Sequence, residues 1–160
     1  MNKSQEQLDI ERRWIADQLN LPYSVYETAV TFPVYDKDGN IMACFALTDF
    51  KEATYGNSVQ ISIAARPDCH KKWCRKSVLL DLAKYVGIDL KCTRLWTQLP
   101  KNNKAARRLN EAFGMKFERC SRRGWDGKHD ALVYSMIPEE AKFLKYYIER
   151  VQKRDSNESS

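Results

Sequence analysis

The stretch NKAARRLNEAFGMKF, residues 103–117, combines a helix start, a helix end and the beginning of a strand. Asn102 or Asn103 can cap the first turn, because an asparagine side chain accepts a hydrogen bond from a backbone N–H that the helix leaves unpaired. Gly114 follows the last turn, where a left-handed backbone conformation is common. We therefore predict a helix between these caps and a strand over 115–120.

Outward from this stretch, apolar residues at helical spacing alternate with short runs of β-branched and aromatic residues. In chain order the further predicted elements are a helix over 4–19, strands over 28–35, 41–48 and 58–65, a helix from about 74 to 86, a strand over 93–99, a strand over 131–137 and a last helix over 138–151. The turn DKDGN, residues 36–40, is typical of a β-hairpin. Gly87 is the predicted C-cap of the second helix, and Pro138 occupies the first turn of the last helix.

This order predicts an α/β fold, with a mixed, mostly antiparallel sheet and helices on both faces. The strand–helix–strand unit over 58–99 predicts a central parallel pair joined by a right-handed crossover. Residues 1–152 are expected to form a single domain. The charged, serine-rich residues 153–160 are expected to be a disordered tail.

The composition narrows the class of protein without choosing a function. The chain has 160 residues and a net charge of +6, which favours anionic partners such as phosphate-bearing cofactors, nucleic acid or acidic protein surfaces. No apolar run approaches the roughly 20 residues of a spanning helix, and the N-terminus lacks a signal-peptide pattern. We expect a cytoplasmic protein with no membrane partner.

Five cysteines, an odd number, predict free thiols. Cys69, His70 and Cys74 lie close together, but their spacing does not match that of structural zinc sites. We therefore predict no metal.

The stretch from 103 to 117 resembles the late motif of the GNAT acyltransferase superfamily, in which an Asn opens a helix and a Gly-Phe pair ends it. Asn103, Ala106 and Gly114 hold the motif's places, with Met115 where Phe is usual. Residues 67–80 fall where the family carries its cofactor loop. The resemblance covers roughly residues 24–137.

The closing segment GWDGKHDALVYSMI, residues 124–137, is similar to the last hairpin of bacteriophage-encoded GNAT-like proteins. Some of those phage proteins are virion components. If this chain is phage-encoded, the resemblance implies the host cytoplasm or the virion as its location, with virion proteins as partners.

The GNAT resemblance implies acetyl-CoA as the cofactor, an amine as the acceptor and a splayed central strand pair that holds the cofactor. It places the pyrophosphate on the N-terminus of the second long helix, where unpaired N–H groups and the helix dipole favour an anion. The implied cofactor-binding residues are Ile63, Ala64, Ala65, Lys71, Lys72, Trp73, Cys74, Arg75, Lys76, Asn103 and Ala106.

Two departures from the family pattern bear on activity. Trp73 and Arg75 stand where the cofactor loop has small residues, so the loop is degenerate, and flanking cations could grip phosphate in place of backbone amides. Asn110 stands where many relatives carry a Tyr that protonates the leaving thiolate, and an amide is no general acid at neutral pH. Glu27 and Asn110 are the catalytic candidates, and neither is assigned a role. Further candidates for the base are Tyr26, Tyr55 and His70.

Three functional hypotheses follow. The first is an acyl-CoA-dependent N-acyltransferase, acetyl in the simplest case, acting on an unidentified amine. The second is a catalytically inactive GNAT-like phage protein that serves in the virion or in binding. The third, favoured less, is a nucleic-acid-directed modifying or binding protein, since Arg119, Arg122 and Arg123 form a second basic cluster. Trp73 itself is interpreted as a packing residue. The oligomeric state stays open.

Overall fold

A computed structural model describes the chain except Met1, Tyr55, Ala141 and Ser160, and leaves out the side chains of His70, Lys71, residues 142–148 and Val151. Its elements are α1 (Gln5–Leu19), β1 (Val30–Tyr35), β2 (Ile41–Lys51), β3 (Asn57–Ala65), α2 (Lys76–Lys84), β4 (Cys92–Pro100), α3 (Lys104–Phe113), β5 (Lys116–Ser121), β6 (Ala131–Met136) and α4 (Lys142–Glu158). Short helical turns also occur at Tyr23–Val25 (η1), Pro67–Trp73 (η2) and Tyr85–Asp89 (η3).

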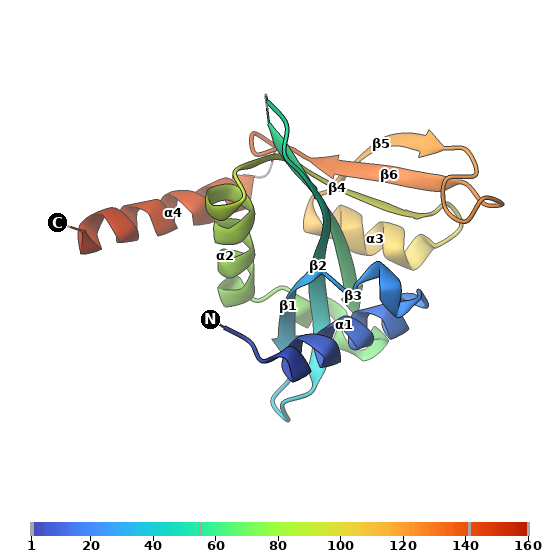
Figure 1. Ribbon diagram of the computed structural model, residues 1–160, viewed down its shortest axis with the longest axis horizontal. Helices are drawn as coiled ribbons and strands as arrows, with labels where there is room; N and C mark the ends of the chain where they lie inside the picture. The colour runs from blue at the N-terminus through green and yellow to red at the C-terminus, as the bar shows by residue number, and fades with distance from the viewer. Residues whose placement is uncertain (1, 55, 141, 160) are drawn as a thin grey trace. The chain divides into compact units, whose positions relative to one another are not determined.

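The six strands form one mixed sheet in the order β1-β2-β3-β4-β6-β5 (Figure 1). β1 pairs antiparallel with β2, and β6 pairs antiparallel with both β4 and β5. β3 and β4 form the parallel pair, with Asn57 opposite Cys92 and Gln60 opposite Trp96. The predicted α/β class, the order of the elements and the parallel pair are confirmed.

The chain divides into two compact units that interleave along the sequence. The first comprises 1–48 and 61–82, and the second 49–60 and 83–160. The boundaries cut β2, β3 and α2. The single-domain organisation stays a prediction.

In the first unit, α1 packs against β1, β2 and the end of β3. Ser4 caps α1, because its hydroxyl accepts a hydrogen bond from Gln7 N at 3.1 Å. The buried core includes Ile15, Tyr26 and Cys44, which are at most 1 % exposed. Tyr26 also donates a hydrogen bond to the Ser62 hydroxyl at 3.0 Å, which ties the segment before β1 to β3.

In the second unit, α3 lies along β4 and β6 (Figure 1). β4 alternates as a half-buried strand should, with Leu95, Thr97 and Leu99 buried. The predicted caps of α3 are confirmed: Asn103 Oδ1 accepts from Ala106 N at 3.0 Å, and Gly114 has φ +106°. A Cβ at Gly114 would meet Met136 Cε at 3.1 Å, so this glycine also lets the helix end approach β6 closely.

Two predicted helix boundaries are wrong, the end of the second helix and the start of the last one. Gly87 is no C-cap, because the turn Tyr85–Asp89 continues the helix with wider bonds and Leu90 N donates to Tyr85 O at 2.8 Å. The left-handed residue comes later, at Lys91 with φ +51°. Pro138 lies in a turn over 138–140 that precedes α4.

α4 continues to Glu158, past the predicted end at 151 and through most of the segment expected to be a disordered tail. No glycine or proline occurs after Pro138 to interrupt it. The Ser156 hydroxyl hydrogen-bonds back to Gln152 O at 2.8 Å, which fits a helical path. None of the described helices is long and apolar enough to cross a bilayer.

Candidate functional site

The segment between β3 and α2, in the first unit, carries most of the residues predicted to bind phosphate. The predicted basic loop forms the 3-10 helix Pro67–Trp73. Arg66 anchors its start, with its guanidinium 3.0 Å from Asp36 and 3.2 Å from Asp68. Cys69 is buried, and its thiol lies 3.5 Å from Met42 O. These contacts hold the chain that leads into α2.

Trp73 is only 6 % exposed, and its ring centroid lies 6.1 Å from that of Phe45. This placement agrees with the packing interpretation of Trp73. Because the Trp73 ring is buried, a ligand could reach this residue only through its backbone.

Exposed cations surround the N-terminus of α2. Cys74, Arg75 and Lys76 are exposed, as is Lys72 in the preceding turn. The first turn of α2 carries no acidic side chain. Within the described part of the chain, no carboxylate lies within salt-bridge distance of Lys72, Arg75 or Lys76. The side chains of His70 and Lys71, also predicted for this site, lie outside the described residues.

This charge arrangement opposes the helix dipole. Acidic side chains normally stabilise a helix N-terminus, and cations there are unfavourable by a few tenths of a kcal/mol each. Leu79 N donates to Arg75 O at 3.0 Å. The backbone N–H groups of α2 before Leu79 come too early in the helix to have an intrahelical partner. The arrangement is chemically suited to an anion, which would pair with the cations and with these N–H groups.

The strand residues predicted to contact a cofactor differ in exposure. Ile63 and Ala64 are 5 % and 3 % exposed, while Ala65 is half-buried. The register of the β3–β4 pair covers Asn57–Gln60, and β3 continues through these three residues in the first unit. Their backbone is therefore the part most able to meet a ligand.

The helix residues predicted for the site lie on α3 in the second unit. Asn103 uses its carbonyl oxygen as the helix cap, and Ala106 is half-buried. Asn110 is 4 % exposed, and its Nδ2 donates to Ala106 O at 2.8 Å. The Asn110 amide thus uses an N–H within its own helix, and its Oδ1 has no hydrogen-bond partner among the described residues.

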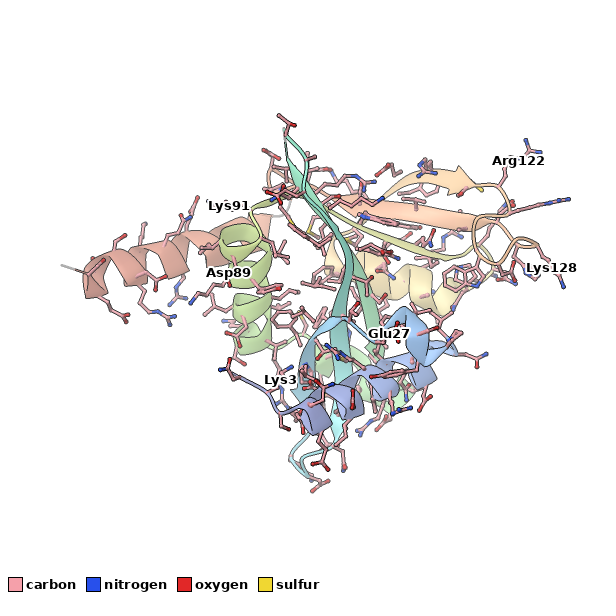
Figure 2. The ribbon with its side chains drawn as sticks, in the orientation of Figure 1. Lys3, Glu27, Asp89, Lys91, Arg122 and Lys128 are labelled. Atoms are coloured by element: carbon pink, nitrogen blue, oxygen red, sulfur yellow. The ribbon has the colours of Figure 1, made fainter. Side chains whose placement is uncertain are left out.

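No general base emerges among the described candidates. Glu27 is exposed in a turn of the first unit, and Figure 2 labels it. Tyr26 is buried, and burial raises the pKa of its hydroxyl. Tyr55 lies outside the described residues. Glu27 thus remains a candidate by position alone.

The sequence did not single out an Asp–His pair in the turn between β5 and β6. His129 Nδ1 lies 2.7 Å from Asp126 Oδ2. The His129 side chain and the backbone N–H groups of 128 and 129 lower the pKa of Asp126 to about 2. The sequence DGKH, residues 126–129, could have indicated this pair, because an Asp in a turn can accept hydrogen bonds from the N–H groups two and three residues further on.

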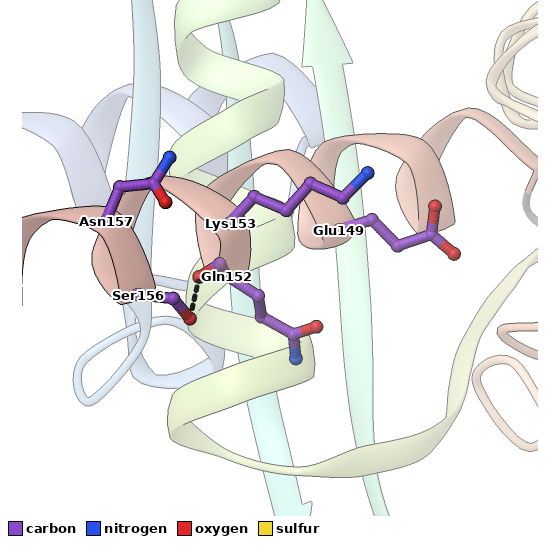
Figure 3. A pocket seen from close by; sticks show the side chains of 5 residues that line it. All are labelled: Glu149, Gln152, Lys153, Ser156 and Asn157. Carbon is purple, nitrogen blue, oxygen red and sulfur yellow. Dashed lines mark hydrogen bonds between the residues drawn. The ribbon is translucent and has the colours of Figure 1, made fainter. Parts of the chain in front are cut away.

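A shallow hollow along α4 in the second unit is lined by Glu149, Gln152, Lys153, Ser156 and Asn157 (Figure 3). None of the predicted site residues lines it. Among the described residues, no three His, Cys, Asp or Glu side chains gather closely enough to hold a metal.

The chain matches no protein-family model and no curated protein sequence. Its fold does match solved structures. A GNAT-family acetyltransferase from Bacillus anthracis is 14 % identical with a TM-score of 0.57, over 84 % of this chain and 90 % of its own. Mutant forms of the spermidine/spermine N-acetyltransferase SpeG from Vibrio cholerae are 16 % identical with a TM-score of 0.60, over 83 % of this chain and 92 % of theirs.

A GCN5-related N-acetyltransferase from Brucella melitensis is 20 % identical with a TM-score of 0.60, over 89 % of this chain and 75 % of its own. At these identities the likeness concerns the fold. The element order, the central parallel pair and these structural neighbours together establish that the chain has the GNAT fold.

Proposed function

We propose that the protein is an acyl-CoA-dependent N-acyltransferase, with acetyl-CoA as its cofactor and an amine as its acceptor. The GNAT fold supports this proposal, although a fold alone does not determine an activity. The observation that carries it is the acid-free N-terminus of α2, with Lys72, Arg75 and Lys76 exposed around it. This feature suits the pyrophosphate of a CoA thioester.

In this proposal the first N–H groups of α2 and the side chains of Lys72, Arg75 and Lys76 hold the phosphates. Lys71 and Cys74 belong to the same segment, and Trp73 keeps it in place from the core. In a regular loop, small residues let the backbone approach phosphate closely. Here the cationic side chains would bind the phosphates instead.

The arm of the cofactor is proposed to contact the backbone of Ile63, Ala64 and Ala65 in the first unit. Asn103 and Ala106, which the family resemblance also implies, belong to the second unit. The bound cofactor supplies an activated acyl group. A backbone N–H near Ile63 would polarise its carbonyl, as oxyanion-type donors do. Neither Glu27 nor Asn110 is assigned a proton-transfer role.

A charge reversal tests the phosphate grip. Acetyl-CoA and a panel of amines are incubated with the protein, and amine-dependent loss of the thioester absorbance is recorded. Arg75→Glu should raise the KM for acetyl-CoA at least tenfold, about 1.4 kcal/mol. Lys37→Glu makes the same charge change in the exposed β1–β2 turn and should leave KM within about twofold.

Equal KM values for the two variants would refute the role of Arg75. No thioester loss with any amine, together with no cofactor binding, would favour the alternative of a catalytically inactive GNAT-like protein.

The turn between β5 and β6 favours a second candidate, contact with a nucleic-acid backbone. Arg122, Arg123 and Lys128 are exposed, and Figure 2 shows Arg122 and Lys128 extending from the turn. The two acids of the turn are engaged within it: Asp130 accepts from Arg123 N at 2.8 Å, and Asp126 binds His129 and two backbone N–H groups. The cations are therefore left for an anionic partner.

Titration of labelled DNA at several salt concentrations tests this candidate. Binding should weaken steeply with salt, and replacing Arg122, Arg123 and Lys128 by alanine should flatten that dependence. Salt-independent or absent binding would refute it.

A further inference from the structure

Positive charge is concentrated in one stretch of the second unit. Residues 101–130 contain nine Lys or Arg and four Asp or Glu, so they hold +5 of the chain's net charge of +6. This stretch runs from the loop before α3 to the turn between β5 and β6. A polyanion is therefore attracted to this part of the chain more than to the rest of it.

The loop before α3 lies beside the β5–β6 turn. Lys101 N donates to Asp130 O at 3.1 Å, and the register of β4 with β6 places Pro100 opposite Ala131. The Asp130 side chain accepts from Arg123 N at 2.8 Å, so this residue is bonded to both segments. The exposed cations of the loop, the start of α3 and the turn therefore belong to one surface, and they are Lys101, Lys104, Arg122, Arg123 and Lys128.

The acidic side chains of the same stretch already have partners. Asp126 accepts from two backbone N–H groups of its own turn. Glu111 accepts from the Tyr134 hydroxyl at 2.9 Å, and Glu118 pairs with Arg94. Within the described part of the chain, no carboxylate lies within salt-bridge distance of the five cations. Their charges are thus left for an external anion such as a phosphate.

An indole lies among these cations. Trp125 is half-buried in the turn, and its backbone N–H donates to His129 O at 3.1 Å, so its main chain is held in place. No aromatic ring or cation of the described residues stacks on this indole. Trp96 differs, because the Arg94 guanidinium lies 5.8 Å from its ring centroid. The exposed part of the Trp125 ring can therefore stack on a flat partner such as a nucleobase.

We propose that the β5–β6 turn and the adjoining loop bind single-stranded nucleic acid, with a base stacked on Trp125 and phosphates paired with the surrounding cations. The inference rests on the second candidate function, the contact with a nucleic-acid backbone, and goes beyond it by naming the form of the partner. In a duplex the bases stack on one another, so a single strand offers its base faces far more readily. An acidic peptide could pair with the cations, but its carboxylates have no ring to stack on the indole.

The experiment measures fluorescence anisotropy with labelled oligo(dT) and oligo(U) of about 20 nucleotides and with a duplex of the same length. The wild type should bind at least one of the two single strands about fivefold or more tighter than the duplex at equal salt. The tighter of the two single strands identifies DNA or RNA as the partner. Unlabelled poly-glutamate, added as a competitor at equal charge, should displace the oligonucleotide poorly.

Two variants of Trp125 separate stacking from packing. Trp125→Phe and Trp125→Leu both keep an apolar side chain in the turn, but only phenylalanine keeps a ring that can stack. The dissociation constant for the single strand should rise at least about fivefold in Trp125→Leu and less than about threefold in Trp125→Phe. Thermal melting of both variants checks that the turn change leaves the fold intact.

A charge variant tests the contribution of the loop. Lys101→Ala with Lys104→Ala should flatten the dependence of log K on log salt by about 0.7 for each phosphate contact that is lost. Lys37→Ala, in the exposed β1–β2 turn of the first unit, should leave the salt dependence unchanged.

Equal wild-type affinity for single strands and duplex, or equal losses in the two Trp125 variants, would overturn the inference and leave the backbone contact standing. Displacement by poly-glutamate as effective as by oligo(dT) would also overturn it, and would assign the surface to an acidic protein. No binding of any nucleic acid would refute the second candidate function together with this inference. Acyl transfer is tested separately, because its proposed phosphate site lies in the first unit.

Discussion

A buried carboxylate in the first unit provides a sharp test of the packing. Glu11 on α1 is 1 % exposed, and its Oε2 lies 2.9 Å from both Lys3 Nζ and Thr31 Oγ1. Tyr35 donates to the other oxygen at 3.3 Å. Lys3 also donates to Thr31 O at 2.6 Å, so one ammonium group joins the segment before α1 to β1.

The variant Lys3→Met removes the ammonium and leaves the carboxylate buried. A hydrogen bond to a charged group contributes about 1.5–3 kcal/mol, and Lys3 is 27 % exposed, so a loss of about 2 kcal/mol is expected. For a chain of this length that corresponds to a fall in melting temperature of about 4–8 °C. Lys37→Met, at an exposed turn, should change stability by less than about 0.5 kcal/mol.

Urea unfolding of a double-mutant cycle measures the interaction. Glu11→Met in the Lys3→Met background should recover part of the lost stability, because it removes the buried charge that has lost its partner. If Lys3→Met unfolds at the same urea concentration as the Lys37→Met control, Lys3 does not stabilise Glu11 and the reasoning is wrong.

Three further outcomes are expected. Because folding lowers the pKa of Asp126 to about 2 from 3.8, its contribution is complete above about pH 4 and is lost as pH falls through 2, so Asp126→Asn should flatten the decline of melting temperature over that window. Burial raises the pKa of the Cys44 thiol to about 12, so a thiol reagent at pH 8 should modify exposed Cys74 and Cys120 and spare Cys44 until the protein unfolds, as peptide mass spectrometry would show. Gly114→Ala should destabilise by at least about 1 kcal/mol in denaturant unfolding, because its φ is +106° and Met136 is close; an unchanged midpoint would contradict that reasoning.

Local chemistry explains which parts of the fold could be predicted. Asn103 and Gly114 cap α3 through bonds within a few residues of each, so the sequence contains all that the boundaries need. The end of the second helix depends on distant residues. Leu90 O accepts from Asn57 Nδ2 at 2.8 Å, and a bond across that sequence separation is invisible to a local pattern that places a cap at Gly87.

The candidate site likewise has features that the local sequence predicts and features that it does not. The cations before and within the first turn of α2 are evident from the sequence, because their exposure and spacing are local properties. The burial of Glu11 was missed, although it lies three residues after Leu8 and four before Ile15, on the apolar side of α1. The free oxygen of Asn110 depends on the side-chain rotamer, which residue spacing does not determine.

The central claim is that this protein binds a CoA thioester at the N-terminus of α2. Calorimetric titration of acetyl-CoA into the wild-type protein at low and moderate salt tests it most directly. The account predicts a dissociation constant in the micromolar range, about −8 kcal/mol, which weakens as salt increases. No heat at any accessible concentration would contradict it, and the GNAT fold would then serve a purpose other than acyl transfer.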